Sequence, residues 1–117
     1  MSDAIPIQFA RVSRAPERVF FNARELRTIL QLYGRMVQAG EWRDYAIDAP
    51  GDRAVFSVYR RSHAAPLYRI EKQPALASRQ GQYAIVGAGG QILKRGRELP
   101  LVLRLLERKL FKLVGAD

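Results

Sequence analysis

The chain has 117 residues, 48% of them hydrophobic and 26% charged, which excludes wholesale disorder and leaves room for one core. Cysteine is absent, which excludes disulfides, thiolate zinc sites and cysteine nucleophiles. No apolar run approaches the roughly 20 residues of a membrane helix, and Asp3 and Pro6 interrupt any signal-peptide pattern. We therefore expect a cytoplasmic protein without a membrane partner.

The chain is strongly basic. It has 20 lysines and arginines against 11 acidic residues, which gives a formal charge of +9. Such a balance is typical of nucleic-acid-binding proteins and makes RNA or DNA a candidate partner. Sixteen of the cations are arginine, however, and genome composition alone can produce such a bias.

Residues 1–20 show no hydrophobic periodicity and include Pro6, Pro16 and three arginines. This pattern predicts a flexible basic arm. The sequence pattern of residues 21–117 predicts a single α+β domain.

The first helix is predicted over residues 23–39. Asn22 and Glu25 have the spacing of a capping box, and Phe21 and Leu26 have that of a hydrophobic staple. Apolar residues follow at helical spacing, and Gly40 occupies the place where a helix commonly ends.

From Trp42 the hydrophobic pattern changes to period two, which indicates strands. The connections are too short for parallel crossovers, so they predict hairpins. The predicted strands are 43–48, 53–61, 67–72, 82–86 and 91–94.

A second helix is predicted from residue 98 or 99 to residue 113, with Pro100 tolerated in its first turn. The predicted fold class is α+β, a five-stranded antiparallel meander sheet. The N-terminal and C-terminal helices pack on this sheet, on one face, because each has one broad apolar stripe to bury.

The string from Tyr83 to Gly90 looks like the start of a dinucleotide-binding turn. That fingerprint needs a glycine where Ile92 stands and a helix immediately afterwards, whereas the pattern here continues as a strand. We predict that residues 87–90 join two antiparallel strands, that at least one glycine has a positive φ, and that no cofactor binds.

Other catalytic patterns are weak. His63 is the only histidine, and no acid is placed to orient it toward Ser62. Asp44 and Asp48 share one side of a strand but lie about 13 Å apart at the usual strand rise, too far to share a proton. The acids fit no calcium loop, so we predict no catalytic residue, no metal and no enzyme activity.

The positive charge is concentrated in the last third, where residues 75–117 hold eight cations and three acids. The leading hypothesis is therefore an accessory protein that binds RNA or DNA through phosphates. Tyr59, Tyr68 and Tyr83 could stack on bases, although aromatic residues on strands are more often in the core. The proposed phosphate contacts are Lys94, Arg95, Arg97, Arg104, Arg108 and Lys112.

The alternative hypothesis is a protein-interaction module or a homodimer built on the C-terminal helix. Leu101 and Leu105 fall outside the main apolar stripe of that helix. A helix that is apolar on more than one arc often contacts something besides its own core.

Four stretches resemble a family of short, uncharacterised alphaproteobacterial proteins grouped as a domain of unknown function. They are GEWRDYAID (40–48), DRAVFSVYRR (52–61), PLYRIEK (66–72) and YAIVGAGGQILKRG (83–96). The resemblance extends over residues 22–106 and implies a bacterial cytoplasmic protein. It implies no activity and assigns no functional residue.

Overall fold

A computed structural model of the chain describes residues 18–61 and 64–114, with residues 110–114 described as backbone only. None of the described helices is long and apolar enough to cross a membrane. In chain order, the elements are α2 (Ala23–Gln38), β1 (Asp44–Asp48), β2 (Ala54–Tyr59), β3 (Tyr68–Lys72), the 3-10 turn η1 (Pro74–Leu76), β4 (Tyr83–Gly87), β5 (Ile92–Gly96) and α3 (Leu99–Val114).

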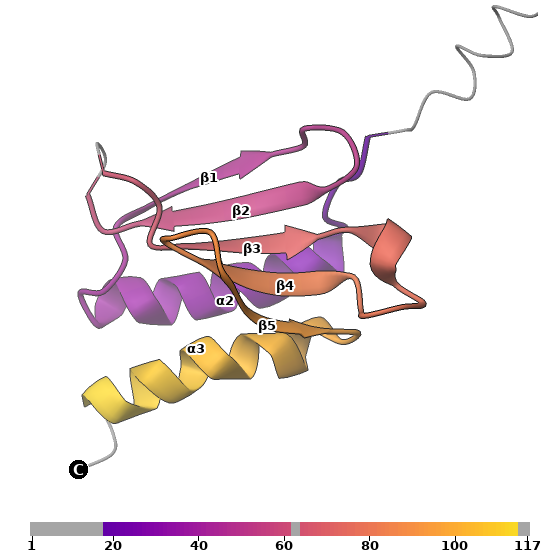
Figure 1. The fold of residues 1–117 in the computed structure, drawn as a ribbon. Coiled ribbons are helices and arrows are strands. Elements are labelled where there is room, and N and C mark those ends of the chain that lie inside the picture. The colour runs from indigo at the N-terminus through magenta and orange to yellow at the C-terminus, as the bar shows by residue number, and fades with distance from the viewer. Residues whose placement is uncertain (1–17, 62–63, 115–117) are drawn as a thin grey trace, which may run out of the picture.

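The five strands form one sheet in the order β1-β2-β3-β4-β5, and every neighbouring pair is antiparallel. Both helices lie on the same face of this sheet, side by side (Figure 1). The predicted α+β meander with two helices is therefore confirmed.

The core lies between the sheet and the two helices. Phe56, Ile70 and Ile85 form a row across the three central strands, and each is fully buried. Ile29 of α2 and Leu106 of α3 belong to the same buried cluster. Full burial of one such side chain stabilises the fold by roughly 1.5–3 kcal/mol, so this row determines which face of the sheet the helices cover.

The opposite face of the sheet is partly screened by arginine side chains. Arg69 and Arg95 are half-buried there, on β3 and β5. The buried Glu71 carboxylate accepts hydrogen bonds from Arg53 Nη1 at 3.3 Å and from Arg69 Nε at 3.4 Å. The aliphatic part of an arginine can cover apolar surface while its charged end pairs with an acid.

The buried carboxylate of Glu25 joins the beginning of α2 to the sheet. In the predicted capping box, the backbone N–H of Asn22 donates to Glu25 Oε1, and the backbone N–H of Glu25 donates to Asn22 Oδ1, each at 2.8 Å. Lys72 Nζ of β3 donates to Glu25 Oε1 at 2.9 Å, and the Tyr83 hydroxyl of β4 donates to Glu25 Oε2. One side chain therefore caps the helix and fixes its start over two strands.

The hydrogen bond between Tyr83 and Glu25 changes the pKa of both side chains. Burial by itself would raise the pKa of Glu25, but hydrogen bonds from Tyr83, Lys72 and the Asn22 amide outweigh burial and hold that pKa below 4.5. Burial and the nearby Glu25 carboxylate raise the pKa of the Tyr83 hydroxyl. Near neutral pH the carboxylate is therefore ionised and the phenol is protonated.

We expect the free energy of unfolding to fall as the pH is lowered below about 4.5, the ordinary value from which the pKa of Glu25 is depressed. The sign follows because the unfolded chain binds the proton more readily than the folded one. Glu25→Gln keeps a capping-box residue but loses the charge, so it should flatten this pH dependence and cost about 2 kcal/mol at neutral pH.

Urea unfolding at a series of pH values measures both effects. Glu98→Gln is the control, because Glu98 is exposed. Equal pH dependence in the wild type and in Glu25→Gln would contradict the role of Glu25.

The end of α2 is closed by backbone hydrogen bonds. The amides of Gly40 and Glu41 donate to the carbonyls of Val37 and Met36, each at 2.9 Å. This pair of bonds is a Schellman motif. It turns the chain sharply, so that β1 runs back along α2 in the opposite direction (Figure 1).

The glycine string forms the turn between two antiparallel strands, as predicted. Gly87 ends β4, Ile92 begins β5, and the Gly90 amide donates to the Gly87 carbonyl at 2.9 Å. Gly90 has a φ of 89°, in the left-handed region that other residues occupy only at a cost. The string is therefore a hairpin connection, without the helix that a dinucleotide-binding turn requires.

We expect Gly90→Ala to lower the free energy of unfolding by about 1 kcal/mol, because alanine is strained at positive φ. A Cβ at Gly90 would meet no atom within 4 Å, so steric contact adds nothing to this cost. Gly89→Ala is the control, because Gly89 is not among the positive-φ glycines. Its added Cβ would approach only Gln91 Oε1, at 2.9 Å, the end of an exposed side chain that can move aside, so Gly89→Ala should cost less stability. Neither NAD, FAD, ATP nor GTP should raise the melting temperature. A clear rise that Gly90→Ala abolishes would contradict the hairpin interpretation.

Candidate nucleic-acid interface

The cations predicted to contact phosphate lie along β5 and α3. Lys94 and Arg95 are on β5, Arg97 follows that strand, and Arg104 and Arg108 are exposed on α3. The side chain of Lys112 lies outside the described part of the chain.

Two of these arginines hold the connection between β3 and β4 in place. Arg95 Nη1 donates to the Gly81 carbonyl at 3.1 Å. Arg97 donates to the carbonyls of Ala77 and Ser78 at 3.3 and 3.5 Å. A Cβ at Gly81 would lie 2.3 Å from the backbone carbon of Gly96, so only glycine lets the chain approach β5 this closely. Both guanidinium groups therefore have a structural role, with donors left over for other partners.

A shallow groove of about 270 Å³ lies where β5 leads into α3. The amides of Leu101 and Val102 both donate to the Glu98 carbonyl at 3.1 Å, and Pro100 has no amide hydrogen. The amides of Leu101 and Val102 are therefore engaged within the chain, and Lys94 and Arg97 are exposed cations of the groove. The lining residues are Lys94, Arg95, Gly96, Arg97, Glu98, Leu101 and Val102.

The structure also brings together cations from both helices. Arg24 and Arg27 are exposed on α2, and Arg104 and Arg108 are exposed on α3. Arg35 of α2 reaches the Glu107 carboxylate of α3 at 3.1 Å, which shows that the two helix surfaces are continuous. We call this surface the helix-layer basic face and define it as Arg24, Arg27, Arg35, Arg104 and Arg108.

Few acids offset this basic face. Within the described helices, Glu25 is buried against the sheet and Glu107 is paired with Arg35. The sequence showed that α2 has a half-basic side, at helical spacing. It did not show that this side adjoins α3, because the two helices are separated by five strands along the chain.

The two leucines predicted as a protein interface have different environments. Leu101 is 47% exposed and lines the groove beside Lys94. Leu105 packs against the core cluster. Leu101 is therefore the member of the pair that offers apolar surface to a partner.

We expect Leu105→Glu to lower the free energy of unfolding by about 2 kcal/mol, because it places a charge against the core. Leu101→Glu should change it by less than about 0.5 kcal/mol, as is usual for exposed positions. Chemical denaturation of the two variants measures the difference. Equal losses would contradict the assignment of Leu105 to the core.

The other candidate residues do not form a site in the described structure. Ser62 and His63 lie outside the described residues. Asp44 and Asp48 are both exposed on β1. Within residues 18–61 and 64–114, no group of three or more acids or histidines could hold a metal ion. The prediction that the chain is not an enzyme stays a prediction.

A family model described as "Protein of unknown function (DUF2794)" matches residues 19–103. The chain belongs to this family. The match begins at Val19, whose amide donates to the Gly51 carbonyl at 3.1 Å, and ends within α3, before Arg104. Neither the curated proteins nor the solved structures contain a match. The resemblance to a family of unknown function is thus confirmed, while the alphaproteobacterial origin and the cytoplasmic location stay predictions.

Proposed function

We propose that the protein binds RNA or DNA through phosphate contacts on the helix-layer basic face. The observation that supports this proposal is the convergence of five arginines from α2 and α3 on one side of the molecule. Lys94 and Arg97 extend the positive charge to the groove at the start of α3.

The spacing of these arginines suits a charged backbone. Arg24 and Arg27, and likewise Arg104 and Arg108, are three or four residues apart on a helix and lie about one turn, roughly 5 Å, from each other. Arginine offers several N–H donors to phosphate oxygens and keeps its charge at all physiological pH values. Phosphate contacts of this kind supply affinity that depends strongly on salt.

Base recognition has less support. Tyr83 is buried and donates its hydroxyl to Glu25, and Tyr68 packs against the core beneath the helices. Neither ring forms a platform on the helix-layer basic face, and Tyr59, the partner of Asp44, lies on the side of the sheet away from the helices. We therefore expect little preference for nucleotide sequence.

The test compares two triple variants with the same net charge. Arg27→Gln, Arg104→Gln and Arg108→Gln remove three cations from the basic face. Arg43→Gln, Arg61→Gln and Arg79→Gln remove three exposed cations from elsewhere. We expect the first triple to weaken binding to single-stranded RNA and DNA oligonucleotides at least about tenfold, with a salt slope smaller by about 3.

The measurement is fluorescence anisotropy at several salt concentrations, with circular dichroism as the check on folding. The control triple should bind nearly as the wild type does. Equal losses in both triples would show that net charge alone attracts nucleic acid, and no binding at low salt would end the proposal.

A further inference from the structure

The strand β1 leaves one edge of the sheet open. No other strand in the described part of the chain pairs with its outer side. Every second residue of an antiparallel edge strand directs its N–H and C=O groups away from its neighbour, so β1 presents unpaired hydrogen-bonding groups. Its five residues pair with β2 in one unbroken register, and a regular edge of this kind can accept a further strand.

The other edge, β5, has features that block such pairing. A bulge interrupts its register opposite Ile85 and Val86. Lys94 is the partner of Ile85, so its charge lies on the side of the sheet that the helices cover. Bulges and inward-facing lysines are common protections of sheet edges. The described structure shows neither feature on β1.

Exposed apolar side chains border the open edge. Tyr45 and Ile47 lie on the helix side of β1, level with Val58 and Phe56, and are 45% and 47% exposed. The ring of Tyr33 on α2 contacts that of Tyr45, with centroids 4.9 Å apart.

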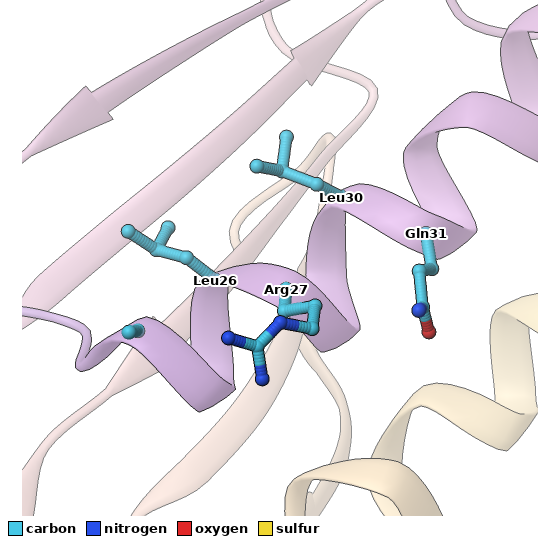
Figure 2. Close-up of a pocket in the computed structure, with 5 residues that line it drawn as sticks. Leu26, Arg27, Leu30 and Gln31 are labelled. Carbon is cyan, nitrogen blue, oxygen red and sulfur yellow. The ribbon is translucent and has the colours of Figure 1, made fainter.

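Leu26, Leu30, Tyr33 and Val37 recur at helical spacing along one side of α2. The contact of Tyr33 with Tyr45 shows that this side of the helix faces β1. Leu30 and Val37 are 38% and 40% exposed. Figure 2 shows Leu26 and Leu30 projecting from one side of α2, and Arg27 and Gln31 from the other. A shallow hollow of about 520 Å³ lies along the helix surface at these four residues and Ala23, and no residue of β1 lines it.

The opposite side of β1 is acidic. Asp44 and Asp48 are exposed on it, and neither forms an ion pair with another described residue. Arg18 and Arg69 line a hollow beside Asp48, so the two carboxylates are the charges that β1 itself presents at this edge and not an extended acidic surface. Together, Asp44, Tyr45, Ile47, Asp48 and the α2 stripe form what we call the β1 edge surface.

We propose that the β1 edge surface binds an extended segment of a partner protein, which adds a sixth strand to the sheet. The segment has basic residues four positions apart, opposite Asp44 and Asp48, and apolar residues at the second and fourth of these five positions, beside Tyr45 and Ile47. Backbone hydrogen bonds supply affinity in this mode of binding, and alternate side chains supply specificity.

Charge disfavours a second copy as the occupant. Antiparallel pairing of two β1 strands about Ala46 would place Asp44 of one chain opposite Asp48 of the other. Like charges that lie directly opposite each other on paired strands are destabilising. A strand with cations at these positions removes the conflict.

The probe is a synthetic seven-residue peptide, acetyl-Ser-Lys-Val-Thr-Val-Lys-Ser-amide, and its control has glutamate in place of both lysines. Ile47→Lys would place a charge on the helix side of the edge, as Lys94 does on β5, and should weaken binding of the lysine peptide at least about tenfold. Ile47→Val should keep it within about threefold, because it preserves an apolar strand residue.

Charge is tested with a matched pair of double variants. Asp44→Asn with Asp48→Asn should weaken binding of the lysine peptide several-fold and strengthen binding of the glutamate peptide. Asp52→Asn with Glu98→Gln removes the same number of charges from exposed positions off the edge and should leave both peptides unchanged. Circular dichroism confirms folding of each variant.

Titration calorimetry and amide hydrogen exchange of the full chain provide the readouts. The lysine peptide should slow exchange at Tyr45 or Ile47 in the wild type. A stable dimer that Ile47→Lys dissociates would overturn the proposal in favour of a second copy. Full protection of β1 in the peptide-free monomer would overturn it in favour of a segment of the chain itself. Failure of the lysine peptide to bind the wild type would also overturn it, and none of these outcomes bears on phosphate binding by the helix layer.

Discussion

The ionised, buried carboxylate of Glu25 is the interaction on which the arrangement of the helices depends. Its donors come from the start of α2, from β3 and from β4. A buried charge without partners is unfavourable by several kcal/mol, so α2 can begin over this corner of the sheet and at few other places. Once the start of α2 and the side it buries are set, the sides of α2 that meet β1, α3 and solvent are also set.

Covering a sheet on one face alone has consequences for the surface. The apolar sides of α2 and α3 are used against the same row of strand residues, so the polar sides of both helices point away together. Arginines that are far apart in the chain then form one basic surface. At the sheet edge beyond α2, β1 combines apolar and acidic side chains, so the two proposed surfaces differ in charge and position. The two proposals therefore do not exclude each other.

The family to which the chain belongs has no described function, so the roles of individual side chains have to be inferred from the structure. Side chains of one type serve different purposes here. Arg95 and Arg97 bind backbone carbonyls and fix a connection, whereas Arg104 and Arg108 extend from α3 toward solvent. Leu105 and Leu101 divide in the same way between the core and the surface. A count of cations or of leucines in a segment cannot make this distinction, because it depends on which groups come within hydrogen-bonding or packing distance.

The sequence by itself determined the two helices, the five strands, their order and the antiparallel meander, because hydrophobic period, capping residues and short connections are local properties. It also identified the capping box at Asn22 and Glu25 and the turn that ends at Gly90. Only the tertiary structure decided that Lys72 and Tyr83 complete the Glu25 site, that Arg24 and Arg27 lie on the same side as Arg104 and Arg108, and that β1 keeps an open edge. These relations join residues distant in the chain, and packing around the core fixes the distances between them, whereas local periodicity fixes only the face on which each residue lies.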